Sequence, residues 1–384
     1  MQVANFIKVL DSLGGNFYAG VPDSLLSPFT DYIIDTFGVS QKHVVTANEG
    51  AAVGLAAGHY LATGHPAVVY MQNSGLGNAV NPICSLLHQK VYKIPTILVI
   101  GWRGEPGTKD EPQHIFQGEC TLSLLECMEI PYVVISKDND TLSTDDLSIN
   151  EFRGHIENGQ TVAFVISKDA LKNGNKVKFS SDAELSREKV LDIIAEESGA
   201  DDVFVCTTGK LSREMFELRE QKGTGHGQDF LTVGSMGHSL MIAYGISLSK
   251  PNKRVFCLDG DGAVLMHMGS LAIVGANNPP NIVHVVINNG AHETVGGIPT
   301  VASHIKLSDV AASLGYEHTF CIATEAELKD ALSRLANLSG AVFIEVICNL
   351  HSRYELGRPT STPIQNKNDF MKFLAQDTNG GGAK

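Results

Sequence analysis

Short runs of apolar, β-branched residues alternate with helical patterns along the whole chain, and this alternation is its most constraining feature. Strands that are apolar on both faces are typical of parallel sheets, because helical crossovers cover both sides of such sheets. The sequence therefore predicts an α/β fold of mostly parallel sheets flanked by helices. The predicted strands are 65–71, 94–100, 130–136 and 161–167 in the first half, and 202–206, 229–233, 254–258, 281–287 and 341–347 in the second.

The alternation is interrupted once, at 168–186, where the sequence gathers Lys, Asn and Ser and reads as a linker. No residue-level repeat is visible between the two halves. A chain of 384 residues suggests two domains. We therefore expect one domain over 1–170, a linker over 171–185, a second domain over 186–374, and a flexible tail over 375–384.

The composition excludes several classes of protein. A net charge of −13 disfavours nonspecific binding to nucleic acid or to acidic membranes. The seven cysteines are an odd number without a C-x-x-C pair, which argues against a disulfide scaffold and favours a reducing compartment. The sequence has neither a signal-peptide pattern nor a long apolar stretch. We expect a cytoplasmic protein with no nucleic-acid or membrane partner.

The most specific motif lies in the second half, where an apolar strand ends in Gly260, Asp261 and Gly262 and a later one ends in Asn288 and Asn289. The 25 residues between Gly262 and Asn288 suit one helix and one return strand, so both polar groups emerge at neighbouring strand ends, where α/β sheets bind ligands. Carboxylate, amide and carbonyl oxygens suit Mg²⁺, and glycines let backbone N–H groups approach phosphate. A lone GDG is more often a turn, but the combination predicts a diphosphate–metal site.

This segment resembles the GDG–NN fingerprint of the thiamine-diphosphate enzymes, which hold the cofactor's diphosphate through Mg²⁺. The resemblance implies that Asp261 and Asn289 are side-chain ligands of the metal and that the carbonyl of Ala291 is the third ligand. Counting alone leaves Asn288 open as the ligand in place of Asn289, which we prefer. The resemblance also assigns three further residues to the diphosphate, namely Gly260, Gly262 and Ala263.

The segment TANEGAAVGLAAGHYLATG (46–64) reads as a strand end followed by a helix that Glu49 opens. The helix dipole alone would favour a carboxylate there. The small-residue face of Gly50, Ala51, Gly54 and Gly58 instead allows close packing against the helix. In the thiamine-diphosphate enzymes a matching Glu binds the aminopyrimidine and stabilises the imino tautomer that removes the thiazolium proton. The resemblance implies this catalytic and cofactor-binding role for Glu49.

Two further loops follow strands in the second half: the first, at 234–237, follows the strand 229–233, and the second, at 207–209, follows the strand 202–206. In the family, a bulky apolar residue in the first loop enforces a bent cofactor, which implies this role for Met236, with Ser235 beside it. An ordinary glycine turn with a core Met is the alternative. In the second loop, Thr207, Thr208 and Gly209 either contact the diphosphate or only cap the next helix.

The chain has room only for a linker where larger family members carry a middle domain. The segments GVPDSLL (20–26), GWRGEPGTKDEPQH (101–114), NNGAHETVGG (288–297) and RYELGRPTSTP (353–363) resemble the phosphonopyruvate decarboxylase family, with the sulfopyruvate decarboxylases as relatives. The resemblance implies thiamine-diphosphate- and Mg²⁺-dependent decarboxylation of 3-phosphonopyruvate to phosphonoacetaldehyde and CO₂. It also implies a homo-oligomer with active sites between subunits.

An anionic 2-oxo acid substrate requires donors for its distal anion. Arg103, Lys109 and His114 lie in one Gly/Pro-rich loop that follows a strand, a usual place for binding residues, and we assign Ser24 to the same substrate site. For any one of these residues taken alone, a solvated surface position is the simpler interpretation.

Two catalytic candidates remain besides Glu49. Asp23 follows the first strand and is assigned to proton transfer at the reacting carbon, although Asp23 or Ser24 capping the next helix explains this position equally well. His292 is close in sequence to a metal ligand, which indicates a role near the cofactor.

Rival functions are weaker. SGLGNAV (74–80) is a near miss to a dinucleotide fingerprint, but it lacks the third glycine, and no acidic residue follows the next strand, so an NAD-dependent oxidoreductase is disfavoured. A non-catalytic protein with the thiamine-diphosphate fold is disfavoured because Glu49, Asp261 and Asn289 are all present.

Overall fold

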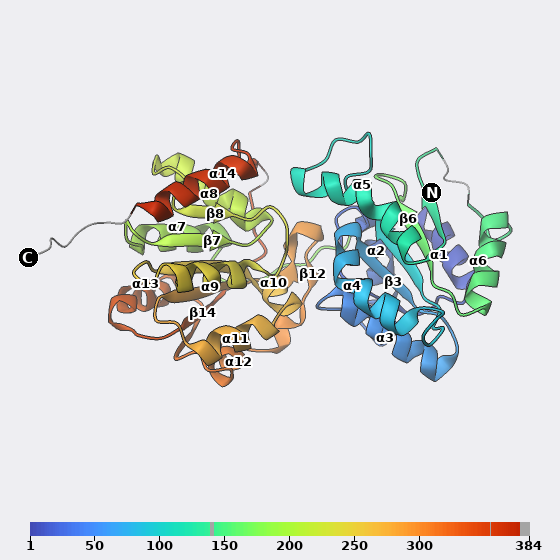
Figure 1. The fold of residues 1–384 in the computed structure, drawn as a ribbon, viewed down its shortest axis with the longest axis horizontal. Coiled ribbons are helices and arrows are strands. Elements are labelled where there is room, and N and C mark those ends of the chain that lie inside the picture. Colours follow the sequence, from blue (N-terminus) through green and yellow to red (C-terminus); the bar gives the residue numbers. More distant parts are fainter. Residues whose placement is uncertain (139–141, 354, 377–384) are drawn as a thin grey trace, which may run out of the picture. The chain divides into compact units, whose positions relative to one another are not determined.

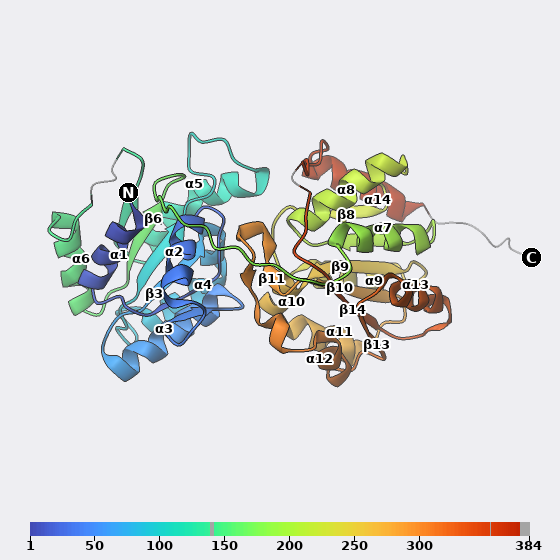
Figure 2. The same ribbon diagram turned by 180° about the vertical axis from the view of Figure 1, so that it is seen from behind.

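A computed structural model describes residues 1–138, 142–353 and 355–376. The chain divides into two compact units, Met1–Lys178 and Phe179–Lys384, with the boundary inside the segment 171–185 that was expected to be a linker. Of the expected tail 375–384, all but the first two residues lie outside the described part. Each unit is a sheet with helices on both sides (Figures 1 and 2).

The described part of the N-terminal unit contains six parallel strands in the order β2-β1-β3-β4-β6-β5. Neighbouring residues of a strand face opposite sides, so Tyr70 belongs to the buried cluster that includes Phe29, while Met71 belongs to the cluster on the other side that includes Ala56. The strands are β1 (Tyr18–Gly20), β2 (His43–Val45), β3 (Val68–Gln72), β4 (Ile97–Gly101), β5 (Tyr132–Ile135) and β6 (Val162–Ile166). The helices are α1 (Val3–Ser12), α2 (Ser27–Phe37), α3 (Glu49–Thr63), η1 (Asn73–Gly75), α4 (Leu76–Pro82), η2 (Ile83–Leu87), α5 (Pro112–Cys127) and α6 (Leu147–Glu157).

The C-terminal unit has a second six-stranded parallel sheet over its described residues, in the order β13-β14-β10-β9-β7-β8. A hairpin of β11 (Ala291–His292) and β12 (Ile298–Pro299) stands apart from it. The sheet strands are β7 (Val203–Cys206), β8 (Asp229–Leu231), β9 (Val255–Gly260), β10 (Ile282–Asn288), β13 (His318–Ile322) and β14 (Val342–Ile347). The helices are α7 (Arg187–Glu197), α8 (Lys210–Lys222), α9 (Ser239–Ser249), α10 (Asp261–Met266), α11 (Gly269–Asn277), η3 (Glu293–Val295), η4 (Val301–His304), α12 (Leu307–Ser313), α13 (Glu325–Arg334), η5 (Leu335–Asn337) and α14 (Pro363–Ala375).

The two sheets share one topology. Read from β8, the second sheet runs β8-β7-β9-β10-β14-β13. If only the strands of the six-stranded sheet are numbered along the chain, both units have the order 2-1-3-4-6-5. Since the halves show no residue-level repeat, the common order depends on the shared pattern of apolar strands and helical crossovers rather than on shared residues.

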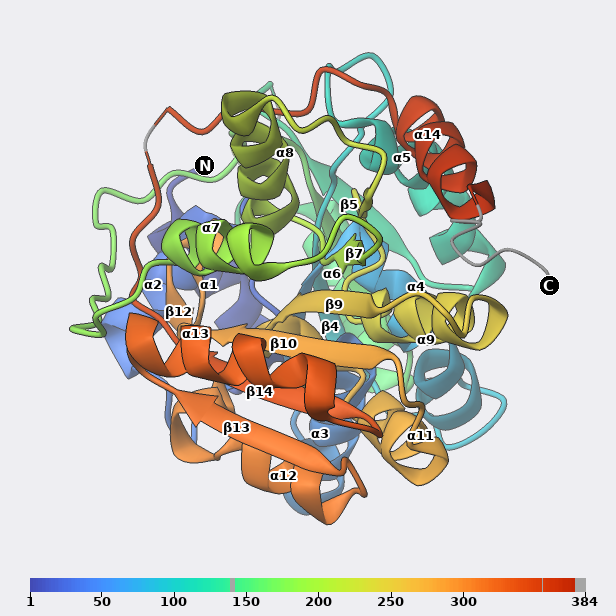
Figure 3. The ribbon, with the colours of Figure 1, turned by 90° about the vertical axis from the view of Figure 1, so that its left-hand side faces the viewer.

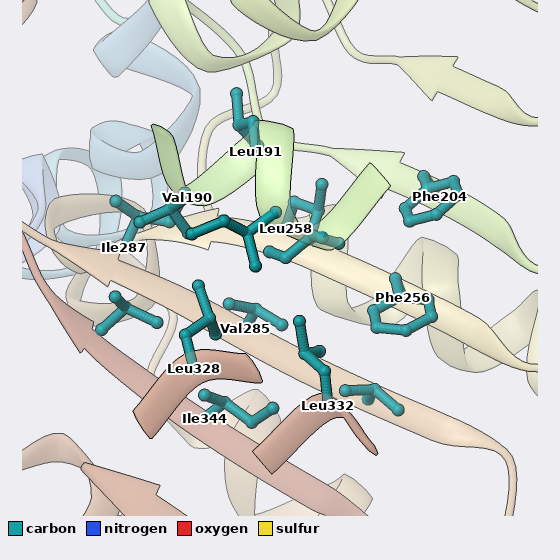
Figure 4. Close-up of a cluster of buried hydrophobic side chains, with 14 of the residues drawn as sticks. Val190, Leu191, Phe204, Phe256, Leu258, Val285, Ile287, Leu328, Leu332 and Ile344 are labelled. Carbon is teal, nitrogen blue, oxygen red and sulfur yellow. The ribbon is translucent and has the colours of Figure 1, made fainter. Parts of the chain in front are cut away.

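The core of the C-terminal unit shows how the apolar runs are used. Val190 of α7 and Leu328 of α13 belong to the buried cluster on one face of the sheet that includes Leu258, Val285 and Ile344 (Figure 4). Figure 3 shows α13 lying across β10 and β14. Burying each such side chain contributes about 1.5–3 kcal/mol, so these contacts hold the strand ends in place.

The predicted strands are all present, and the predicted helix at 49–63 has the bounds of α3. Three sheet strands lie outside the predicted ranges: β1 and β2 have three residues each, and β13, with the sequence HTFCI, is mostly only partly buried and has no continuous apolar run. The helix α4 ends at Pro82, and the π-helical turn η2 continues from it to Leu87. Among the described helices, none is long and apolar enough to cross a membrane.

The contact of Gly275 with the backbone generates a stability prediction. A Cβ at Gly275 in α11 would lie 2.2 Å from the Leu314 carbonyl oxygen, so Gly275→Ala should lower the free energy of unfolding by about 1–3 kcal/mol through overpacking. Gly245, inside α9, has no described atom near its Cβ position, so Gly245→Ala should instead add about 0.5–1 kcal/mol. Urea unfolding measures both, and a shift of the same sign in both variants would contradict the packing.

Candidate active site

Asp261 and Asn289 meet at the carboxyl ends of two paired strands. The strand β9 ends at Gly260 and β10 ends at Asn288, so the residues that follow leave the sheet side by side. Asp261 is 3% exposed, and Thr300 donates a hydrogen bond from Oγ1 to its carboxylate. Burial raises the pKa of Asp261 to about 6, while Thr300 and the backbone N–H groups of Gly262 and Asn289 act in the opposite direction. The sheet thus brings a buried carboxylate and the NN turn together.

The two asparagines have different partners. Asn288 donates from Nδ2 to the buried Glu345 at 2.8 Å and accepts from the Gly290 N–H, so its amide is engaged with the core strand β14. Asn289 accepts from the Ala291 N–H at 3.1 Å within the turn that faces Asp261. Asn289 likewise donates from Nδ2 to Glu293, so these hydrogen bonds do not choose between the two asparagines, and Asn289 as the metal ligand stays a prediction. The carboxylate, amide and carbonyl oxygens of Asp261, Asn289 and Ala291 fit a hard divalent cation.

Glu293 anchors the same turn to the rest of the unit. It accepts hydrogen bonds from Asn289 at 3.2 Å, from Arg187 at 2.5 Å and from Lys210 at 2.9 Å. Arg187 also binds the buried Glu214 through two nitrogens. Burial alone would raise the pKa of Glu293, but Arg187 and Lys210 lower it to about 2. The turn is therefore tied by charge to the start of α7 and to the start of α8.

Met236, His292 and Gly262 lie together. A Cβ at Gly262 would come within 2.9 Å of His292 Cε1 and 3.4 Å of Met236 Cε, so a larger residue at this position would displace the His292 ring. Ser235 has a φ of 58°, in the left-handed region that strains a residue with a side chain. Burial lowers the pKa of His292 to about 4, which makes the ring neutral at pH 7.

The loop after β7 lies next to the NN turn. A Cβ at Gly209, which has a φ of 98°, would touch Thr294 at 3.5 Å. Thr207 is buried, and its Oγ1 has no hydrogen-bond partner among the described residues. Gly209 itself is the N-cap of α8 and no side chain caps that helix in the described structure, so capping does not explain Thr207 or Thr208. An unsatisfied hydroxyl and a free helix start fit a phosphate group. Together with Gly260 and Ala263 at the start of α10, these loops make up the candidate site for a phosphate group and its metal ion.

The N-terminal unit holds Glu49 in a narrow setting. Glu49 is 5% exposed and begins α3, whose N-cap is Asn48. Asn78 donates from Nδ2 to Glu49 Oε2 at 2.7 Å, and a Cβ at Gly75 would lie 2.5 Å from Glu49 Oε1. The segment SGLGNAV, weighed above as a dinucleotide fingerprint, thus forms the wall beside Glu49.

The small-residue face of α3 is only partly used within the unit. Gly50 packs closely, with its Cβ position 2.9 Å from the Asn78 carbonyl oxygen. Ala51 is exposed, and no described atom lies near the Cβ positions of Gly54 and Gly58. The expectation of close packing therefore holds here for Gly50.

A second polar group in the N-terminal unit, the Arg103 cluster, comprises Asp23, Ser24, Arg103, Asp110 and His114. Arg103 binds both oxygens of Asp110, at 2.8 Å and 2.6 Å, and donates from Nη1 to Ser24 at 3.1 Å. Asp23 accepts from the Leu25 and Leu26 N–H groups through Oδ2, while its Oδ1 is buried without a partner among the described residues. Asp23 therefore both caps the turn before α2 and keeps one oxygen available.

The charges of the Arg103 cluster do not form a simple basic pocket. Burial raises the pKa of Asp23 to about 6 despite the nearby Arg103. Burial and Arg103 lower the pKa of His114 to about 4, so this side chain is neutral at pH 7. Arg103 is thus the cluster's only cation, and Asp110 balances it. Lys109 is exposed and has no ion pair or hydrogen bond within the described ranges, so the structure does not bring it into the cluster.

Several partners in the site were missed by the sequence analysis. Asn78 and Asp110 come after β3 and β4, so their position beyond an apolar run was a usable signal. Glu293 lies four residues after Asn289, outside the GDG–NN motif, and no local pattern marks it. Thr300 reaches Asp261 only through the β11–β12 hairpin, and no local pattern marks it.

Comparison with known proteins relates both units of the chain to thiamine pyrophosphate enzymes. Residues 2–125 match the description "Thiamine pyrophosphate enzyme, N-terminal TPP binding domain", and residues 207–346 match the corresponding C-terminal TPP binding domain. A phosphonopyruvate decarboxylase of Streptomyces viridochromogenes is 34% identical over 97% of this chain and 94% of its own length. A phosphonopyruvate decarboxylase of Streptomyces hygroscopicus is 32% identical over 98% of this chain and 94% of its own. A sulfopyruvate decarboxylase of Methanosarcina acetivorans is 24% identical over 89% of each chain.

The buried Asp23 generates a prediction about stability and pH. Its folded-state pKa of about 6 lies above that of an unfolded Asp, about 3.9, so the folded state loses stability as the pH rises from about 4 to 6. Asn can still accept from Leu25 and Leu26 but cannot ionise. Asp23→Asn should therefore be more stable than the parent by about 1–3 kcal/mol at pH 7.5 and show little difference at pH 4.

Thermal or urea unfolding across this pH range measures the difference. The exposed Asp145 in the same unit offers a matched Asp-to-Asn control, since a surface substitution such as Asp145→Asn should change the free energy of unfolding by less than about 0.5 kcal/mol. A constant difference between Asp23→Asn and the parent at all pH values would exclude the raised pKa.

Proposed function

Because this chain belongs to the thiamine pyrophosphate enzyme family and is a 2-oxo acid decarboxylase, we propose that its substrate is 3-phosphonopyruvate, which it converts to phosphonoacetaldehyde and CO₂. The observation that carries the proposal is the identity of 32–34% to two phosphonopyruvate decarboxylases over nearly the whole of each chain. Sulfopyruvate is the alternative substrate. The sulfopyruvate decarboxylase from Methanosarcina acetivorans also aligns along most of this chain, so a single fused chain does not distinguish the two.

The residues of the C-terminal unit support a site for thiamine diphosphate held through Mg²⁺. Asp261, Asn289 and the Ala291 carbonyl would bind the metal, and the unsatisfied Thr207 hydroxyl is free to donate to the diphosphate. Six further residues would line the cofactor, namely Thr208, Gly209, Ser235, Gly260, Gly262 and Ala263. When bound, the cofactor supplies a thiazolium ring that accepts the electron pair released by the departing carboxylate.

The residues on the chain would then bind, orient and move protons. Glu49, fixed by Asn78 and Gly75, would hold a proton at a carboxyl oxygen against the aminopyrimidine. Met236 would support the bent cofactor. The neutral His292 ring, with one donor and one acceptor nitrogen, would form a hydrogen bond near the reacting carbon. Decarboxylation to an aldehyde consumes one proton, and the buried Asp23, with its raised pKa, would donate it from its unpaired oxygen.

The Arg103 cluster would receive the substrate's distal anion. Arg103 and Ser24 present a guanidinium edge and a hydroxyl, and His114 adds a neutral ring with an unpaired Nδ1. Lys109 would contribute only if its loop rearranged on binding. Pyruvate has no distal anion, so this cluster gives it no comparable contact.

The substrate assignment predicts an order of catalytic efficiency. With thiamine diphosphate and Mg²⁺ added, kcat/KM should be highest for phosphonopyruvate, lower for sulfopyruvate by about one to two decades, and lowest for pyruvate. Enzyme treated with a chelator should regain activity when Mg²⁺ is restored. A higher kcat/KM on sulfopyruvate would transfer the assignment to that substrate, and equal efficiency on pyruvate would remove it.

The proposal that active sites form between subunits of a homo-oligomer predicts complementation. Glu49→Gln should lower turnover by about 10²-fold or more, and Asp261→Ala should abolish Mg²⁺-dependent cofactor binding. Since Glu49 and Asp261 lie in different units of the chain, a mixed oligomer would contain some sites that are intact. Mixing the two inactive variants under subunit-exchanging conditions should restore part of the activity, whereas each variant alone should stay inactive. A fully active monomer would contradict the shared site.

A further inference from the structure

Asp110 holds the Arg103 guanidinium along one edge. Its two carboxylate oxygens accept from Arg103 Nε at 2.8 Å and from Arg103 Nη2 at 2.6 Å. Such a bidentate pair fixes the plane of a guanidinium as well as its position. The side chains are only 21% and 14% exposed, so solvent screens the pair weakly.

The backbone in turn holds Asp110. Its oxygens also accept from the Gly104 N–H and the Glu111 N–H, each at 2.8 Å. A carboxylate accepts about four hydrogen bonds, so Asp110 is saturated. Burial alone would raise the pKa of Asp110, but Arg103 and the Gly104 N–H hold it below its usual value. The orientation of Arg103 is therefore set by the backbone of its own loop.

The opposite edge of Arg103 lies where polar groups remain unsatisfied. Nη1 donates to the exposed Ser24, and the adjacent Asp23 has a buried Oδ1 without a partner in the described part of the chain. Asp23 is 2% exposed. His114, which interacts electrostatically with both Arg103 and Asp110, has an unpaired buried Nδ1. Ser24 takes one of the two Nη1 N–H groups, so the second Nη1 N–H has no hydrogen-bond partner among the described residues and can donate to a ligand.

We propose that Asp110 is a positioning residue for substrate specificity, which fixes Arg103 so that its Nη1 edge, beside Ser24, receives the tetrahedral oxyanion of the substrate. The inference rests on the proposed function, because it assumes a 2-oxo acid with a distal anion. Asp110 itself does not contact the substrate and acts through Arg103.

Two roles for Asp110 predict opposite signs. If Asp110 were only a counter-ion, removing its charge would leave Arg103 more attractive to every anion, and KM would fall. If Asp110 positions Arg103, its loss releases the guanidinium from the required orientation, and KM rises although the cluster becomes more positive. The direction of the change in KM therefore decides between them.

Asp110→Asn should raise the KM for phosphonopyruvate about tenfold or more, the scale of a lost charge-assisted hydrogen bond, while kcat at saturation changes little. Asp110→Glu keeps the charge but lengthens the side chain, so it should raise KM as well. Glu105→Gln is the matched control, because Glu105 lies in the same loop but binds Ser167. Its KM and kcat should stay within about twofold of the parent. An unchanged or lower KM in both Asp110 variants would overturn the proposal.

A double-mutant cycle tests the route through Arg103. In an Arg103→Lys background the bidentate pair with Asp110 cannot form, so Asp110→Asn should change KM little further. Additive effects of the two substitutions on KM would contradict a role through Arg103. Calorimetry with 3-phosphonopropionate, which has a carboxylate and a phosphonate but no 2-oxo group and so cannot be decarboxylated this way, gives a readout without turnover. Its affinity should fall about tenfold in Asp110→Asn and stay unchanged in Glu105→Gln.

The two proposals fail separately. If the parent binds 3-phosphonopropionate and Asp110→Asn weakens this binding, but the parent does not decarboxylate phosphonopyruvate, the proposed function is wrong and the positioning role stands. If the parent decarboxylates phosphonopyruvate and Asp110→Asn leaves both KM and the calorimetric affinity unchanged, the positioning role is wrong and the proposed function stands.

Discussion

The central strands of both sheets are buried on both faces, and the rest of the structure depends on this constraint. A polar side chain within such a strand would need a buried partner, so most of the chemistry is placed where strands end. Asp261 and Asn289 follow β9 and β10, Asp23 follows β1, and Arg103 follows β4. The carboxyl edge of each parallel sheet gathers these residues, although they are far apart in the sequence.

At these strand ends the carboxyl groups have two kinds of surroundings, which shift their pKa values in opposite directions. Glu293 is surrounded by Arg187, Lys210 and Asn289, and its pKa is lowered to about 2. It is a fixed anion that holds a loop. Asp23 has one oxygen capped and one left without a partner among the described residues, and burial raises its pKa to about 6. Perturbed carboxyls of the second kind are typical of groups that transfer protons.

The same topology carries different chemistry in the two units. Both sheets have one strand order, yet one edge displays a buried glutamate and an arginine cluster, while the other displays oxygen ligands and a free helix start. The fold supplies the position, and the loops supply the function. For this reason the residues of the strands indicate little about the substrate. The segment between β4 and α5, which contains Arg103 and Asp110, is more informative about it.

The sequence by itself determined the α/β class, the two units, and the residues of the GDG–NN and TANEG motifs, because apolar periodicity and motif spacing are local properties. It could not reveal that Asn78 and Gly75 enclose Glu49, that Thr300 reaches Asp261, or that Asp110 neutralises Arg103. It also grouped Lys109 with Arg103 by proximity, while the described structure leaves Lys109 exposed. Only the tertiary structure decided these pairings, because hydrogen bonds and ion pairs depend on distances between side chains that sequence separation does not measure.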